Sequence, residues 1–253
     1  MSILLNDLVE AIEQKLSPWL FKDYAPNGLQ VEGCREIRQL VSGVTACEAL
    51  LDAAIAVNAN VILVHHGYFW QGENPCLTGM KRRRLGKLIQ HDISLIAYHL
   101  PLDAHPELGN NACLGKRLGF EITGTMDASE QTSTGLTGRL ETPQTLDTLG
   151  KQVEQALGRT PLLISGGNHA IKKIAWCTGS AQGYIEKAWA LDVDAYISGE
   201  ISEQTTHFAR ENGIHYIAAG HHATERYGVQ ALGEWLSETQ GIAHQFVDID
   251  NPV

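Results

Sequence analysis

The chain has 253 residues, of which 43% are hydrophobic, so it can bury a sizeable core in one large domain or in two closely packed halves. Its 19 basic and 29 acidic residues give a formal net charge of −10, which argues against a broad nucleic-acid or anionic-membrane surface. Five scattered cysteines without a C-x-x-C pair indicate neither a disulfide framework nor a thiolate metal site. Nothing resembles a signal peptide or a membrane span, so we expect a cytoplasmic protein.

The first half of the chain alternates predicted helices and strands. Apolar residues at helical spacing from Leu5 to Leu16, after a plausible N-cap at Asn6, predict the first helix. The turn-rich segment 23–33 has the composition of a connector. The pattern then predicts a strand at 39–44, a helix at 47–57, a strand at 60–65, a helix at 80–90 and a strand at 92–98. Strand, helix and strand at this spacing form a βαβ unit with parallel strands.

A short helix at 110–118 and a stretch at 120–140 where we expect irregular strand and linker lead into the second half. A helix at 145–157 and a strand at 161–165 come next. The later elements are predicted strands at 173–178, 194–198 and 213–219, helices at 182–191 and 202–211, a helix opening near residue 221, and an edge strand at 242–249. This order repeats the plan of the first half.

Aligning the two halves indicates an internal repeat. Placing Glu200 opposite His66 aligns the first βαβ units at an offset of 134 residues, and placing Ile214 on Ile93 aligns the next strands at an offset of 121. The first half therefore carries 13 extra residues, which we place in the loop 67–79. We predict an α/β protein of two pseudo-repeated halves, residues 1–125 and 126–253, packed closely enough to count as one domain.

Histidines and carboxylates gather where predicted strands end. Six of the eleven histidines lie just after three strands, together with two carboxylates: His65, His66, His99, Asp103, His105, His221, His222 and Glu225. Ligands of open α/β sheets bind beyond the carboxyl ends of strands, so we expect these side chains to converge. Nitrogen and oxygen donors without thiolate suit Zn, Mn or Fe(II). The number of donors favours two ions, with Asp103 as a candidate bridge and Glu225 as a terminal ligand.

Several of these residues have more than one interpretation. His99, His105 and His222 could be metal ligands, but they could equally support a ligand or touch the substrate. Glu200 could cap a helix, orient a substrate or move a proton. The basic run Lys81 to Arg84 is typical of a solvated helix face, and a phosphate-attracting rim is the less common alternative.

The motifs resemble the Nif-three-like dinuclear-metal family, also called GTP cyclohydrolase 1 type 2 homologues. The matching stretches are 23–31, 64–67, 99–103, 198–200 and 220–225. The resemblance implies a Nif-three-like α/β fold of two related halves, a site for two divalent ions per chain (Zn, Fe, Mn or similar) at their junction, and a toroidal homohexamer. By position, it implies that the metal ligands are His65, His66, Asp103, His221 and Glu225.

The resemblance also implies a function. We expect a metal-dependent hydrolase of the GTP cyclohydrolase type that acts on a purine nucleotide or a damaged nucleotide, with Glu200 and His99 as catalytic residues. The alternative is a non-catalytic protein that binds or delivers metal, or a ring-forming regulatory protein. Nucleic-acid binding through Lys81 to Arg84 is disfavoured by the net charge.

Overall fold

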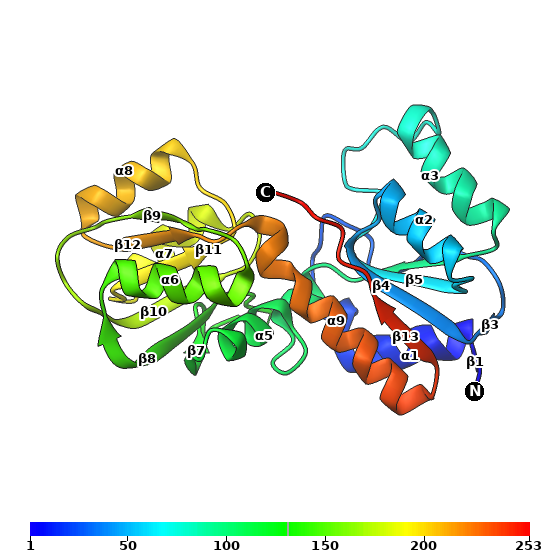
Figure 1. The fold of residues 1–253 in the computed structure, drawn as a ribbon, viewed down its shortest axis with the longest axis horizontal. Coiled ribbons are helices and arrows are strands. Elements are labelled where there is room, and N and C mark those ends of the chain that lie inside the picture. The colour runs from blue at the N-terminus through cyan, green and yellow to red at the C-terminus, as the bar shows by residue number, and fades with distance from the viewer. Residues whose placement is uncertain (131) are drawn as a thin grey trace. The chain divides into compact units, whose positions relative to one another are not determined.

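The computed structural model describes residues 1–130 and 132–253, which form two compact α/β units (Figure 1). One unit contains residues 1–102 and 228–250, and the other contains residues 103–227 and 251–253. The predicted α/β class is confirmed. The division of the chain into halves at residue 125 stays a prediction. Within the described part of the chain, no helix combines the length and apolarity needed to cross a bilayer.

The first unit is built on a five-stranded sheet. Its strands lie in the order β13 (Ala243–Phe246), β4 (Gln39–Thr45), β5 (Val61–His66), β6 (Ser94–Ala97) and β2 (Gly28–Val31). A small ribbon pairs β1 (Ile3–Leu4) with β3 (Glu36–Ile37). Helices α2 (Glu48–Ala56) and α3 (Gly79–Gln90) cover one face, and α1 (Leu5–Leu16) lies on the other with the later part of α9 (His221–Gln240) (Figure 1). A 3-10 turn, Pro18–Leu20, comes after α1.

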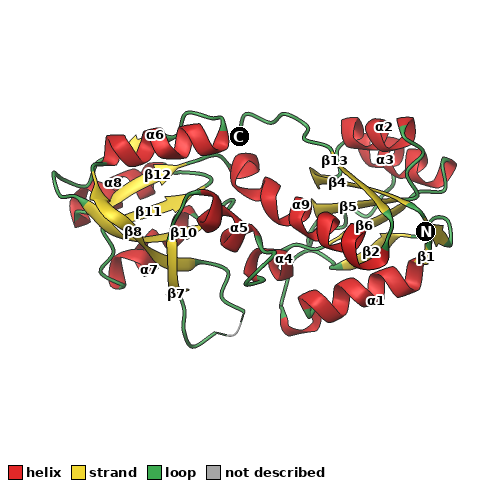
Figure 2. Ribbon diagram, turned by 60° about the horizontal axis from the view of Figure 1, so that its bottom comes forward, coloured by secondary structure: helices red, strands yellow, loops and turns green. Residues whose placement is uncertain are grey.

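The second unit is built on a six-stranded sheet. Its order is β7 (Glu121–Thr125), β8 (Leu136–Gln144), β10 (Ile171–Cys177), β11 (Ala195–Ser198), β12 (His215–Ala218) and β9 (Leu162–Ile164). Helices α5 (Asn110–Arg117) and α6 (Leu146–Leu157) pack on one face, while α7 (Ile185–Ala190) and α8 (Glu203–Asn212) pack on the other. Figure 2 shows α6 and α7 on opposite sides of this sheet. The short helix α4 (Leu100–Ala104) and the 3-10 turn Gln182–Tyr184 complete the elements described.

The strand registers of the two sheets match residue for residue at the predicted offsets. In β4 and β5, Leu40 pairs with Val61, and Ile174 pairs with Ala195 at the equivalent place in β10 and β11. The next strand continues the match, because Val61 pairs with Ser94 and Ala195 pairs with His215. Strands β4, β5 and β6 therefore correspond to β10, β11 and β12, as the alignment of the sequence predicts.

The turns that enter these strands correspond as well. Asn58 and Asp192 have φ values of 54° and 55°, and both come after the helix that precedes the second strand of each triplet. Asp92 and Gly213 have φ values of 55° and 70° before the third strand. Asn, Asp and Gly tolerate this left-handed conformation better than other residues do. Both offsets, 134 and 121 residues, thus hold outside the strands.

Each sheet also contains strands that come from outside its own repeat. Strand β13, which comes after α9, pairs in parallel with β4 of the first sheet. Strands β7 and β8 come before the second repeat, and β8 pairs antiparallel with β10. The predicted strand at 242–249 does lie at an edge, and the edge belongs to the first sheet.

Two local predictions were wrong. Asn6 lies inside α1, whose N-cap is Leu4. Part of the predicted connector, Gly28–Val31, is strand β2 and pairs with β6. The irregular strand expected within 120–140 is present, because β7 pairs with β8 through a register shift between Ile122 and Gly124. Their cross-strand partners, rather than an apolar alternation in their own sequence, hold them in the sheet.

Candidate functional site

Three imidazoles converge at the carboxyl ends of β5 and β6. His65 and His66 are the last two residues of β5, and His99 lies just after β6. One nitrogen from each ring lies within 4.8 Å of the others, as donors to one metal ion would. His65 is fully buried, His99 is 7% exposed and His66 is half-buried. The predicted convergence of these two strand ends is therefore present within the first unit.

Gly67, the residue after β5, lies close to strand β2. A Cβ on Gly67 would overlap the Gln30 side-chain amide. That amide accepts a hydrogen bond from Tyr68 N–H at 2.7 Å and donates one to the Pro26 carbonyl at 2.8 Å. Gly67 does not have a positive φ, so the space around it, rather than a left-handed turn, requires glycine here.

Hydrogen bonds fix the orientation of two of the three imidazoles. His65 Nδ1 donates to the Tyr98 carbonyl at 3.0 Å, which leaves the lone pair on Nε2. His99 Nδ1 lies 2.9 Å from Asp23 Oδ1, so its lone pair is also on Nε2 when the ring is neutral. Metal-binding histidines commonly have this arrangement, in which a carbonyl or carboxylate accepts the proton of the other nitrogen.

Asp23 is held in place by the loop around it. Its carboxylate accepts hydrogen bonds from Asn27 Nδ2 and Leu100 N–H, both at 2.9 Å, as well as interacting with His99. Burial raises the pKa of Asp23, but the hydrogen bonds with His99, Asn27 and Leu100 outweigh it and lower the pKa to about 2. Asn27 Oδ1 also accepts from His99 N–H at 2.7 Å. The segment 23–33 is therefore part of the site and not a plain connector.

The second unit contains a buried carboxylate, Asp103, that is only 7% exposed. Asn110 Nδ2 donates to its Oδ1 at 2.9 Å, and the Thr178 hydroxyl donates to the same oxygen at 3.3 Å. Burial, together with the charges of Asp103 and Glu225, raises the pKa of the Cys177 thiol to about 12. This part of the unit therefore concentrates negative charge out of water, which favours a bound cation.

His221 lies between two carboxylates at the start of α9. Its Nδ1 is 2.6 Å from Glu200 Oε1, and its Nε2 is 3.1 Å from Glu225 Oε2. Burial lowers the pKa of His221, but Glu225 and then Glu200 outweigh this and raise it to about 9. The spacing of four residues does place His221 and Glu225 together, as the helix geometry predicts.

Gly179 allows this arrangement to form. Its φ is +67°, and a Cβ there would overlap the Glu225 carboxylate and lie 3.3 Å from His221 Nε2. Gly179 N–H donates to Thr224 Oγ1 at 3.1 Å. Sequence reasoning missed Gly179, Asn110 and Thr178, and it read Asp23 and Asn27 only as part of a motif. The only sequence feature that could have indicated Gly179 is its position two residues after the end of strand β10 at Cys177.

The remaining candidates have structural contacts. His105 Nδ1 accepts hydrogen bonds from Glu107 and Leu108 N–H, at 3.2 and 3.0 Å, and so closes a turn. His222 is 8% exposed, and its backbone N–H donates to the Val253 carbonyl at 2.9 Å. Both residues belong to the second unit, which also contains Asp103, Glu200 and Glu225.

Two of the four residues in the basic run on α3 form ion pairs. Lys81 pairs with Glu73 at 3.3 Å, and Arg83 pairs with Glu48 at 3.6 Å. Lys87 on the same helix pairs with Glu48 at 3.1 Å. These ion pairs favour the solvated helix face over a phosphate-attracting rim.

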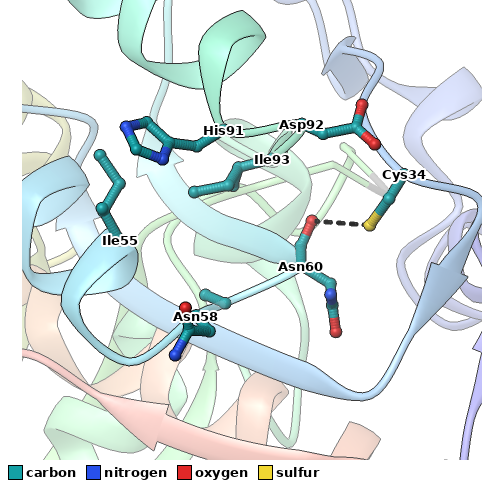
Figure 3. A pocket seen from close by; sticks show the side chains of 8 residues that line it. Cys34, Ile55, Asn58, Asn60, His91, Asp92 and Ile93 are labelled. Atoms are coloured by element: carbon teal, nitrogen blue, oxygen red, sulfur yellow. Dashed lines mark hydrogen bonds between the residues drawn. The ribbon is translucent and has the colours of Figure 1, made fainter.

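A pocket of about 300 Å³ lies at the opposite ends of the same strands (Figure 3). It is lined by residues just before β5 and β6, including Asn60 and Ile93, with Cys34 and His91 nearby. Burial and then the charge of Asp92 raise the pKa of the Cys34 thiol, so it remains protonated and a poor metal ligand. This pocket lies at the amino ends of the strands, away from the imidazoles.

Comparisons with known proteins agree over the whole chain. The family model described as Duf34/NIF3 (NGG1p interacting factor 3) matches residues 3–252. A Pseudomonas aeruginosa protein named GTP cyclohydrolase 1 type 2 homolog is 57% identical over 252 residues, covering 100% of both chains. The solved structure of protein ybgI, of unknown function, is 48% identical with a TM-score of 0.96, covering 99% of this chain and 100% of that one. TTHA1606 from Thermus thermophilus is 33% identical with a TM-score of 0.89 at the same coverage.

Proposed function

Because the chain belongs to the Duf34/NIF3 family, we propose that it is a metal-dependent hydrolase that acts on a purine nucleotide or a damaged nucleotide. The nucleotide class is suggested by the name of its relatives, GTP cyclohydrolase 1 type 2 homolog. One observation carries the metal part of the proposal. In two of the proposed ligand imidazoles, His65 and His221, Nδ1 is held by a carbonyl or carboxylate oxygen.

The residues fit two divalent cations better than any organic cofactor. We propose that the ions are bound by His65, His66, Asp103, His221 and Glu225, three imidazoles and two carboxylates. Imidazole and carboxylate donors without thiolate suit Zn, Mn or Fe(II). When bound, such ions lower the pKa of a coordinated water and polarise the bond that is attacked.

The chain's own residues position groups and move protons. Asp23 accepts a hydrogen bond from Nδ1–H of His99, so that Nε2 of His99 can take a proton from an attacking water while the carboxylate stabilises the imidazolium that forms. Glu200 Oε1 accepts a hydrogen bond from Nδ1–H of His221, which would leave the Nε2 lone pair of His221 for an ion. Glu200 is thus a positioning residue and His99 a catalytic one.

Metal content and turnover test the proposal together. Protein purified without oxygen should hold about two ions per chain by elemental analysis. With GTP, chromatography should detect formate and a ring-opened product. His65→Ala and Asp103→Ala should lose both metal and turnover, whereas His91→Ala, an exposed histidine at the other end of the strands, should lose neither. Metal below about one ion per chain, unchanged in the ligand variants, would reject the site.

The alternative function is metal binding or delivery without catalysis. The anchored imidazoles support this function equally well, because they bear on metal affinity alone. The two functions differ in turnover. A protein that retains its full metal content but converts neither GTP nor other purine nucleotides, with any of several metals, would be a metal-binding protein and not a hydrolase.

We further propose that the chain forms a ring-shaped homohexamer in the cytoplasm, a proposal supported by the family resemblance. Light scattering coupled to size-exclusion chromatography should give the mass of six chains. A monomer mass at micromolar concentration would contradict it.

A further inference from the structure

The two repeats differ most in the loop after their second strand. In the second repeat, residues 199–202 alone connect β11 to α8. In the first, residues 65–78 lie between the equivalent points, so they contain most of the 13 extra residues. The extra chain includes Tyr68, Phe69 and Trp70. The first repeat has therefore acquired an aromatic loop directly after His65 and His66.

This loop places Trp70 beside the imidazoles. The Trp70 ring centroid is 5.1 Å from that of His99, with the planes at 80°, and 5.9 Å from that of His66. Tyr24, from the loop that carries Asp23, lies 4.9 Å from His99 at 75° and 5.6 Å from Trp70 at 35°. Tyr24 and Trp70 thus form an aromatic wall, two adjoining rings that both stand edge-on to His99.

Backbone hydrogen bonds hold this aromatic wall in place. Trp70 Nε1 donates to the Gly67 carbonyl at 3.2 Å, and Gln71 N–H donates to the Tyr24 carbonyl at 2.8 Å. Phe69, next to Trp70, has a φ of 65°, a conformation that is unfavourable for a bulky residue. Strain of this kind clusters at functional sites and persists only where the surroundings impose it. The wall is preorganised, and the protein maintains it at a cost to stability.

The aromatic wall is partly exposed to solvent, and the carboxylates next to it are paired. Tyr24 is 53% exposed, and Trp70 is half-buried. The two carboxylates of these loops, Asp23 and Glu73, are engaged: Asp23 with His99, and Glu73 with Trp70 N–H at 3.2 Å and Lys81 at 3.3 Å. A cationic ligand would need uncompensated negative charge, whereas a neutral planar ring needs only the aromatic faces.

We propose that Tyr24 and Trp70 form a stacking platform for the purine ring of the substrate, beside His66 and His99. The inference rests on the proposed function and deepens it, because it assigns residues that recognise the base rather than the reacting bond. Base stacking on an aromatic side chain tolerates different bases, since every base presents a π face. A platform of this kind would accept intact and damaged purines alike.

The test measures binding and does not depend on turnover. Equilibrium dialysis of the metal-containing protein against guanosine and against ribose should show that guanosine binds and ribose does not. Tyr24→Leu and Trp70→Leu should each weaken guanosine binding by about five-fold to about a hundred-fold. Tyr24→Phe, which keeps the ring, should bind like the wild type. Trp189→Leu, which removes a 49% exposed tryptophan from α7, is the matched control and should not change binding.

Elemental analysis of each variant should give the wild-type metal content. Equal affinity for guanosine and ribose in the wild type, or wild-type guanosine binding by either Leu variant, would overturn the platform. Loss of guanosine binding in both Leu variants of a protein that converts no nucleotide would remove the hydrolase proposal and leave the platform standing. Turnover together with wild-type guanosine binding in those variants would support the hydrolase proposal and overturn the platform.

Discussion

The first and second repeats share a scaffold but differ in the residues that come after each strand. The triplets β4–β5–β6 and β10–β11–β12 have identical registers. After the second strand, the first repeat has His66 where the second has Glu200, and after the third strand it has His99 where the second has Gly220. The first repeat thus supplies imidazole nitrogens, and the second supplies carboxylates and His221.

This difference separates the requirements of the fold from those of the site. Paired apolar residues set the register, so the strands can correspond while their sequences differ. The loops beyond the strand ends are free to change without disturbing the pairing. Substitutions at equivalent positions in the two repeats test this comparison.

Gly179 should give the largest effect. It corresponds to Thr45 of the first repeat, whose hydroxyl contacts His66 Nδ1 at 3.2 Å. Gly179→Ala places a Cβ on the Glu225 carboxylate at a φ of +67°, so we expect a loss of about 3 kcal/mol in the free energy of unfolding, measured with urea.

The matched control is Gly183→Ala, because a Cβ there meets nothing within 4 Å. It should change the free energy of unfolding by less than about 1 kcal/mol. Equal effects of the two substitutions would mean that the second repeat tolerates a side chain at residue 179, as the first does at residue 45.

Glu200 tests whether a carboxylate supports a histidine in the second repeat as Asp23 does in the first. Glu200→Gln removes the charge 2.6 Å from His221 Nδ1, so the pKa of His221 should fall from about 9 toward its ordinary value. Metal affinity, measured by competition with a chelator, should fall by about ten-fold to about a hundred-fold. Glu203→Gln, an exposed residue of α8, should leave both quantities unchanged.

Asp23 should show a pH-dependent effect of intermediate size. Its folded pKa of about 2 is below the ordinary value of 3.8, so its contribution to stability is present above about pH 4 and is lost as the pH falls toward 2. Asp23→Asn should therefore destabilise the protein by about 1–2 kcal/mol at pH 7 and by less at pH 3. Urea unfolding at both values, with the exposed Asp250→Asn as control, measures the difference. A loss independent of pH would contradict the assignment.

The smallest effect concerns a matched pair of strand starts. Ser94 Oγ accepts from Gly33 N–H at 3.0 Å in the first repeat, and His215 Nδ1 accepts from Gly166 N–H at 3.2 Å in the second. Burial lowers the pKa of His215, so its contribution to stability is present above about pH 6.5 and is lost as the pH falls below it.

His215→Ser should reduce this pH dependence by less than about 1 kcal/mol between pH 7 and pH 5, while Ser94→Ala should not change it. Hydrogen exchange of Gly166 N–H, compared with that of Gly33 N–H, reports on each contact separately. If lowering the pH increased hydrogen exchange equally at both glycines, the proposed difference between the repeats would be wrong.

Apolar periodicity and repeated topology were enough to predict most of the helices, the strand triplets and the alignment between the repeats. Strand β2 was not predicted, because its four residues contain Gly28 after Asn27 and resemble a turn. Asp23 was noted only within a motif and not as the partner of His99, since it lies 76 residues away and the bond depends on the folded loop. The role of Gly179 depends on the volume of Glu225, which no local pattern in the sequence indicates.

The place of β13 has a consequence for the order in which the chain folds as it is made. Residues 1–102 contain β4, β5 and β6, but the neighbour of β4 on its outer side is Ala243–Phe246. Until residues 243–246 have left the ribosome, the edge of β4 exposes unpaired backbone groups that can pair with another chain. The first sheet to be synthesised therefore waits for a strand made more than 190 residues after β4, and removal of β13 damages the unit that contains residues 1–102.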